Sequence, residues 1–127
     1  MKMQLLIDTH IFIWSVMDSE KLGSKARRVI LDATKVFVSA VSVWEIAIKA
    51  KIGKLEGDPN EFADAIAKSG FRELPISAHH AARVHELPLY HRDPFDRMLI
   101  AQALSESLRF LTADGMLSQY SELVIAA

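Results

Sequence analysis

The sequence predicts an α/β domain in which helices cover a central, mainly parallel sheet of about four or five strands, in three layers. Short aliphatic or β-branched segments alternate with longer amphipathic segments along the chain. This alternation is typical of parallel strands joined by helical crossovers. No stretch is rich enough in proline, glycine or serine to act as a linker, so residues 1–127 are expected to form one domain.

The first half of the chain carries two segments with strand character. Residues 4–8 (QLLID) are short and aliphatic without alternation, and residues 36–41 (VFVSAV) are β-branched and aromatic. Helices are expected from the spacing of apolar residues and from cap and stop residues such as Asp58-Pro59 and Gly53. The expected helices occupy residues 10–17, 24–31, 42–52 and 58–69.

The second half repeats the pattern. Ser77 is expected to cap a helix that ends before Pro88. A further helix is expected at residues 93–107 (DPFDRMLIAQALSES), which begin with a cap and an early proline. A turn or short helix is expected at residues 114–120 (DGMLSQY). The expected strands occupy residues 71–76 (FRELPI), 109–113 (RFLTA) and 122–126 (ELVIA).

Composition narrows the class of protein. The chain has 0 cysteines, which excludes disulfides and thiolate metal sites. No apolar run reaches the roughly 18 residues that a membrane span needs, and an acid interrupts the N-terminal apolar stretch too early for a signal peptide. We therefore expect a cytoplasmic protein without membrane contact. The net charge of -1 means that any nucleic acid must be bound by a local basic patch.

Acidic residues stand at the ends of the expected strands or at the starts of the helices that follow. The acids in question are Asp8, Glu45, Asp93, Asp96 and Asp114. Strands of a parallel sheet that feed right-handed crossovers all end at one edge, where α/β proteins place their sites. Acids from four distant stretches are therefore expected to meet at one rim.

Each acid also has a structural explanation. Asp8 and Asp93 could be helix N-caps, Ser42 and Glu45 fit a capping box, and Asp114-Gly115 is a common turn dipeptide. Caps, however, need only a short polar residue, and here acids stand at every rim position. Crowded carboxylates must take up protons unless a cation holds them. Mg²⁺ fits best, with Mn²⁺ as a substitute, and the chemistry indicated is metal-assisted phosphodiester hydrolysis.

Four segments, LLIDTH, SAVSVWEIAIKAKIGKL, HRDPFDRMLIAQA and FLTADGML, resemble those of PIN-domain ribonucleases in order and approximate spacing. They look most like the VapC-type toxins of bacterial toxin–antitoxin pairs. The resemblance covers nearly the whole chain and implies a PIN-like three-layer fold with a Mg²⁺-dependent endoribonuclease site. It implies that the catalytic and metal-binding residues are Asp8, Glu45, Asp96 and Asp114.

The resemblance leaves other residues in supporting roles. Asp93 is expected to support the site, with a plain N-cap as the equal alternative, and Thr112 could hydrogen-bond a ligating carboxylate or serve only as a strand residue. Arg92 and Arg97 could hold phosphates or pair with neighbouring acids. Lysines after Glu45, namely Lys49, Lys51 and Lys54, could hold phosphates or simply be solvated. The histidines have no common zinc spacing.

The resemblance also implies partners: an RNA substrate (transfer, ribosomal or messenger), a VapB-type antitoxin and a second copy of the chain. A homodimer would also cover the apolar surface expected on the helices at residues 10–17 and 24–31.

Two other classes of function compete with the nuclease. A Mg²⁺-dependent phosphatase or phosphotransfer domain also opens with a strand that ends in aspartate. A haloacid-dehalogenase-like member would need a second aspartate where this chain has His10, and a receiver would need a phosphoacceptor aspartate that VFVSAV lacks. A non-catalytic binding domain would use its acids only as caps, and such caps would bind no Mn²⁺.

Overall fold

The computed structural model describes residues 3–127 and contains a five-stranded, wholly parallel sheet in the order β3-β2-β1-β4-β5. The strands are β1 (Gln4–Ile7), β2 (Lys35–Ser39), β3 (Arg72–Leu74), β4 (Arg109–Thr112) and β5 (Val124–Ala126). The α/β fold expected from the sequence is therefore confirmed.

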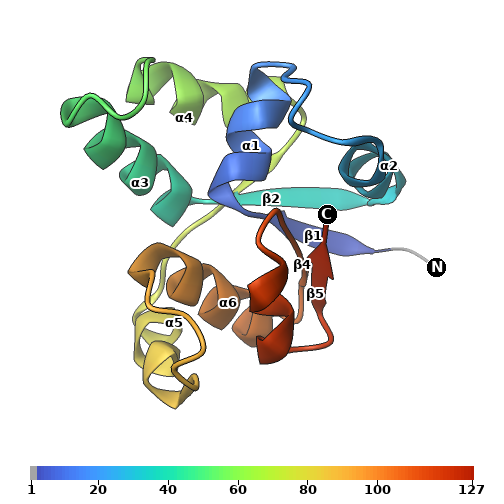
Figure 1. The fold of residues 1–127 in the computed structure, drawn as a ribbon, viewed down its shortest axis with the longest axis vertical. Coiled ribbons are helices and arrows are strands. Elements are labelled where there is room, and N and C mark those ends of the chain that lie inside the picture. Colours follow the sequence, from blue (N-terminus) through green and yellow to red (C-terminus); the bar gives the residue numbers. More distant parts are fainter. Residues whose placement is uncertain (1–2) are drawn as a thin grey trace.

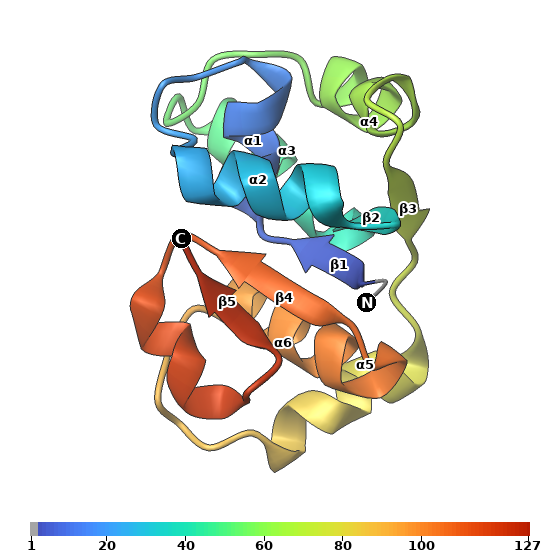
Figure 2. The ribbon, with the colours of Figure 1, turned by 90° about the vertical axis from the view of Figure 1, so that its right-hand side faces the viewer.

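Helices cover both faces of this sheet and make three layers (Figures 1 and 2). One face carries α1 (Thr9–Val16), α2 (Ser24–Asp32), α3 (Ala40–Lys51) and α4 (Pro59–Lys68). The other face carries α5 (Ala78–Arg83), the 3-10 turn η1 (Val84–Glu86) and α6 (Pro94–Glu106). The 3-10 segment η2 (Gly115–Tyr120) connects β4 to β5.

Strand β1 lies at the centre of the sheet and contributes to a core on each face. Leu5 and Ile7 pack with α1 and α2, whereas Leu6 points to the opposite face and packs with α6. All three side chains are fully buried. A central strand that is apolar on both faces explains why QLLI shows no alternation.

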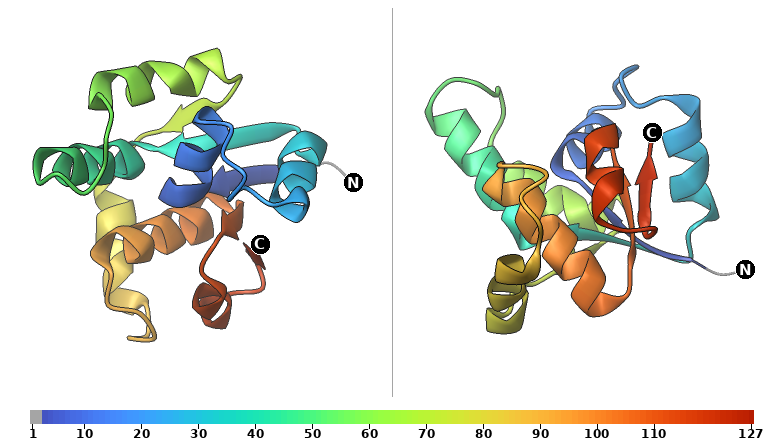
Figure 3. Two further views of the ribbon diagram at one scale, coloured as in Figure 1. Left: turned by 45° about the horizontal axis from the view of Figure 1, so that its top comes forward. Right: turned by 60° about the horizontal axis from the view of Figure 1, so that its bottom comes forward.

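The carboxyl ends of β1 and β4 lie side by side. The two strands are paired in parallel, and the N–H of Asp8 extends the ladder by donating to the carbonyl of Leu111 at 2.9 Å. Figure 3 shows from two further directions that the chain leaves both strands on the same side of the molecule. Residues that directly follow β1 and β4 must therefore be neighbours.

The start of α3 differs from the expectation. The helix begins at Ala40, and its N-cap is Ser39, whose Oγ accepts from the N–H of Val41 at 3.0 Å. Ser42 is not a cap, since its Oγ accepts from the Thr9 hydroxyl at 2.9 Å, so the capping box with Glu45 was wrong. Glu45 instead lies in the second turn of α3.

The expected surplus of apolar surface on the first two helices is also smaller than predicted. Helix α1 is largely covered within the chain, because its residues Ile11, Phe12 and Ile13 are buried. Met17, just after α1, and Leu31 in α2 are exposed. Within residues 3–127, no helix combines the length and the apolar character that crossing a bilayer would require.

Candidate active site

A pocket of about 480 Å³ opens where β1, β4 and the N-terminal end of α6 meet. We call it the acidic pocket, after the four aspartates among its lining residues. Its lining consists of Asp8, His10, Trp14, His91, Asp93, Asp96, Ala113, Asp114 and Gly115. Four of the five acids expected at one rim therefore line a single pocket, although they come from three separate parts of the chain.

Asp8 is buried at the floor of the acidic pocket and is held by hydrogen bonds at both oxygens. Its Oδ1 accepts from the N–H of Ile11 at 2.8 Å, which makes Asp8 the N-cap of α1. Its Oδ2 accepts from the Thr112 hydroxyl at 2.7 Å and from the N–H of Ala113 at 3.1 Å. Burial raises the pKa of the Asp8 carboxyl, and these hydrogen bonds act in the opposite direction.

Asp114 follows β4 and is held by His91 from the loop before α6. The N–H of Asp93 donates to Nδ1 of His91 at 3.1 Å, so Nδ1 has its lone pair engaged and the ring proton resides on Nε2. Nε2 in turn donates to Oδ2 of Asp114 at 3.0 Å and lies 3.8 Å from Oδ2 of Asp96. His91 therefore presents a hydrogen to the acids rather than a free lone pair.

His91 was not among the catalytic, metal-binding or supporting residues expected from the sequence. Its position two residues before the N-cap of α6 was the available signal, since this spacing allows a side chain to bond back to the cap. Which acid it would meet depends on how β4 approaches α6, and that is a tertiary property.

Asp93 and Asp96 share the first turn of α6 but differ in their surroundings. Oδ1 of Asp93 accepts from the N–H groups of Phe95 at 2.8 Å and Asp96 at 3.3 Å, so Asp93 is the N-cap, as one of its two expected readings required. The pKa of Asp96 is raised to about 7, first by burial and then by the negative charges of Asp93 and Asp8. His91 acts in the opposite direction, and Glu45 adds the smallest increase.

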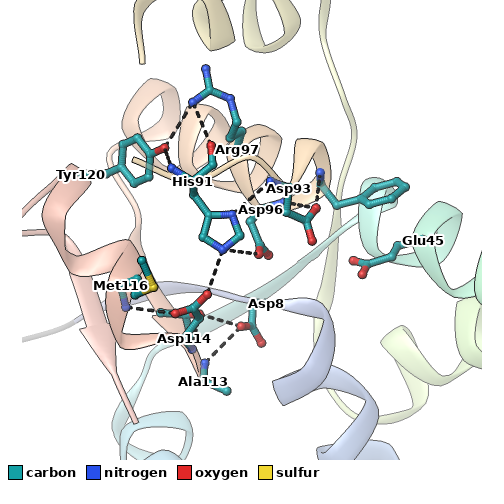
Figure 4. A network of polar contacts seen from close by, with 12 residues as sticks. Asp8, Glu45, His91, Asp93, Asp96, Arg97, Ala113, Asp114, Met116 and Tyr120 are labelled. Carbon is teal, nitrogen blue, oxygen red and sulfur yellow. Dashed lines mark hydrogen bonds and ion pairs between the residues drawn. The ribbon is translucent and has the colours of Figure 1, made fainter. Parts of the chain in front are cut away.

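Glu45 reaches the site from α3 and is 3% exposed. Its Oε2 pairs with Nζ of Lys49, one turn later, at 2.7 Å. Its Oε1 is buried and has no hydrogen-bond partner in the described part of the chain. Figure 4 shows the Glu45 carboxylate directed toward the side of the pocket where Asp93 and Asp96 lie. A buried carboxylate oxygen without a donor is unfavourable unless something positive binds it.

The donor atoms fit a hard divalent cation. One atom each from His91, Asp96 and Asp114 lie within 4.8 Å of one another. Because Nε2 of His91 carries its proton, the ligands offered here are carboxylate oxygens, with Asp8 and Glu45 close enough to affect Asp96 electrostatically. Oxygen donors without sulfur or free imidazole suit Mg²⁺ or Mn²⁺ better than softer metals.

Two of the expected supporting residues do not face the acids. Arg97 is 9% exposed, and its guanidinium donates to carbonyls of the loop before α6, including Pro88 at 2.8 Å and Val84 at 3.1 Å. It therefore holds the loop that carries His91, and the expected phosphate contact or acid pair was wrong. Arg92 is exposed and lines a separate apolar pocket beside Trp44. Thr112, in contrast, does hydrogen-bond an acid of the site.

Comparisons with known proteins agree with the fold. A model of the PIN domain family matches residues 5–123, whereas no curated protein sequence matches the chain. The structure is similar to VapBC2 from Rickettsia felis bound to a promoter DNA fragment, with a TM-score of 0.69, 14% identity and 98% of each chain covered.

Two further solved structures share the fold. A toxin-antitoxin complex from Klebsiella pneumoniae matches with a TM-score of 0.67, 20% identity and 96% of each chain covered. VapC20 from Mycobacterium tuberculosis, a toxin that cleaves the sarcin-ricin loop, matches with a TM-score of 0.61 and 15% identity. That match covers 93% of this chain and 97% of VapC20. At these identities the likeness concerns the fold alone.

Proposed function

The chain belongs to the PIN-domain family, and we propose that it is a Mg²⁺-dependent endoribonuclease, the VapC-type toxin of a type II toxin–antitoxin pair. The observation that supports this most is the state of Glu45 and Asp96. Glu45 has a buried oxygen without a donor, and burial together with neighbouring negative charges raises the pKa of Asp96 to about 7. Both features are relieved by one divalent cation among the carboxylates.

Asp8, Glu45, Asp96 and Asp114 are the residues that would hold Mg²⁺. When bound, the ion supplies activation of a water molecule and neutralisation of the charge that develops on the phosphodiester. Asp8 is already oriented by Thr112 and by the N–H of Ala113, so its position does not depend on the ion.

Asp114 and Asp96 differ in how far the chain itself prepares them to bind the ion. Asp114 is oriented by His91 and by the N–H of Met116, which donates to its Oδ1 at 3.0 Å. Asp96 must lose its proton before it can act as a ligand, since a ligating carboxylate must be ionised.

The proposal also includes partners. The Klebsiella structure is a toxin-antitoxin complex, and VapBC2 was solved bound to a fragment of its promoter. These neighbours support a VapB-type antitoxin and a cytoplasmic setting for this chain. Exposed apolar residues, among them Trp44 at 58%, support a homodimer. Sedimentation of the pure protein and co-expression with the product of a neighbouring reading frame test these two associations directly.

The central experiment incubates the pure protein with transfer, ribosomal and messenger RNA in Mg²⁺ and in EDTA. Cleavage is expected only in Mg²⁺, and Asp96→Asn should abolish it while leaving the circular dichroism spectrum unchanged. The matched control is Asp64→Asn, which changes an exposed acid in α4. Cleavage that persists in EDTA, or that survives Asp96→Asn, would overturn the metal assignment.

A further inference from the structure

A second cleft of about 470 Å³ adjoins the acidic pocket. Its lining consists of His10, Ile13, Trp14, Met17, Ser19, Lys21, Lys49, Lys54 and Leu55. We call it the basic cleft, since it contains three lysines and no acid. The two cavities share His10 and Trp14, so the basic cleft begins where the acidic pocket ends.

The lysines of the basic cleft are placed to bind an anion outside the metal site. Lys21 and Lys54 are exposed, and their ammonium groups have no hydrogen bond or ion pair among residues 3–127. Lys49 instead contacts Oε2 of Glu45 at 2.7 Å. The basic cleft therefore carries two unpaired positive charges and a third charge at its border with the acids, which favours a ligand with several negative charges.

The shared wall of the two cavities is aromatic. His10 and Trp14 lie one turn apart on α1, and their ring centroids are 5.7 Å apart at an interplanar angle of 41°. His10 is exposed and Trp14 is half-buried. Aromatic faces beside a row of lysines are the combination that binds single-stranded nucleic acid, because bases stack on the rings while the lysines contact phosphates.

We propose that the basic cleft binds the single-stranded stretch of RNA next to the phosphate that is cleaved in the acidic pocket. Lys21 and Lys54 contact phosphates of this stretch, and an unpaired base stacks on the wall formed by His10 and Trp14. Lys49 stands between the two sites and keeps Glu45 in place. This inference rests on the proposed ribonuclease function. It adds that the site recognises single-stranded RNA and that this strand continues from the cleaved phosphate into the basic cleft.

The test measures binding of a fluorescein-labelled RNA of about 12 nucleotides, a length within the reach of single-strand sites. Fluorescence anisotropy is recorded with Ca²⁺ in place of Mg²⁺, over a range of salt concentrations. The variant is K21E/K54E, and the charge-matched control is K51E/K68E, which changes two exposed lysines of α3 and α4 that lie outside the basic cleft.

The double variant K21E/K54E is expected to weaken binding and to lower the salt slope by about 0.7 for each lysine lost. K51E/K68E should leave the slope within about half of that value of the wild type. Trp14→Leu should weaken binding by roughly 10- to 100-fold, while Trp14→Phe, which keeps a stacking face, should restore most of it. A duplex of the same sequence should bind more weakly than the single strand.

Equal salt slopes for K21E/K54E and K51E/K68E would overturn the inference, as would equal affinity of Trp14→Leu and Trp14→Phe. The same variants are also tested against an acidic peptide. Loss of peptide binding with unchanged RNA binding would assign the basic cleft to a protein partner instead. The proposed function is judged separately, by Mg²⁺-dependent cleavage with the wild-type protein, so the two failures can be distinguished.

Discussion

The acidic pocket has two halves that differ in how their carboxylates are satisfied. On the strand side, both oxygens of Asp8 and both oxygens of Asp114 accept hydrogen bonds from the chain itself. On the helix side, Glu45 has one oxygen without a donor in residues 3–127. Within the same residues the Asp96 carboxylate accepts no hydrogen bond, and Nε2 of His91 lies 3.8 Å from it.

The difference separates two tasks. The strand side is organised by folding, because its hydrogen bonds come from residues that the sheet brings together. The helix side requires a bound cation, because its acids carry more negative charge than the chain neutralises. Changes on the strand side should therefore affect stability first, and changes on the helix side should affect metal binding first.

The largest effect is expected from Asp96→Asn on the helix side. Removal of this carboxylate should lower the affinity for Mn²⁺ by at least about 100-fold, since even residues that only support metal ligands typically contribute ~10- to 100-fold. Electron paramagnetic resonance of free Mn²⁺ during a titration measures this directly, with Asp64→Asn as the control. An unchanged isotherm would show that the helix side does not bind the metal.

The pH dependence of the metal-free protein should come next in size. The pKa of Asp96 is about 7 in the folded chain, against 3.8 as the ordinary value. The folded state therefore binds this proton more tightly, and the free energy of unfolding should fall as the pH rises from about 4 to about 7. The shift corresponds to at most about 4 kcal/mol.

Chemical denaturation at a series of pH values, without metal, measures that slope. Asp96→Asn should flatten it, and only part of the slope should remain because the pKa of Asp8 is also raised. Mg²⁺ added above pH 7 should restore stability in the wild type but not in Asp96→Asn. A wild-type stability that rises over this pH range would contradict the crowding of charge on the helix side.

Thr112→Val tests the strand side. The change removes a hydroxyl that donates to Asp8 and accepts from the N–H of Asp114, with little change in shape. Loss of a hydrogen bond to a buried charge should lower the free energy of unfolding by about 1.5–3 kcal/mol. Denaturant unfolding at pH 8 measures it. The control is Thr34→Val, which removes an exposed hydrogen bond to the carbonyl of Met3 and should have a smaller effect. A loss of metal affinity without loss of stability would reverse the assignment of the two halves.

The smallest effect is expected from His91→Gln, since His91 orients Asp114 but offers the metal no lone pair. Metal affinity should fall by about 10-fold, the lower end for supporting residues. His91→Ala should lose more than His91→Gln, because only glutamine keeps an N–H donor in reach. Isothermal titration with Mn²⁺ compares them, and equal losses in both variants would favour direct metal binding by the imidazole.

Sequence reasoning succeeded where a topological rule applied. Asp8 and Asp114 follow neighbouring parallel strands, so their convergence needs only the rule that such strands end at one edge. The start of α6 could also be predicted, because Asp93-Pro94 combines a cap with a proline at the first helical position.

Sequence reasoning failed where a side chain has several possible hydrogen-bond partners. Ser39 and Ser42 both lie near the start of α3. Ser39 caps the helix, whereas Ser42 lies within its first turn and accepts a hydrogen bond from Thr9 of α1. Arg97 was expected to hold phosphates or to pair with a neighbouring acid, yet its guanidinium donates to carbonyls of an irregular loop. Neither contact has a local sequence signal, since both depend on tertiary packing.

The hydrogen bond between Thr112 and Asp8 joins residues 104 positions apart. In a growing or partly folded chain that has paired only β1, β2 and β3, Asp8 and Glu45 are in place, whereas Thr112 and Asp114 are not. The proposed metal site is therefore incomplete in such an intermediate, even if its helices have formed. Under the proposed function, metal-dependent cleavage therefore requires that β4 has docked, and a polypeptide still being synthesised would not cleave the RNA around it.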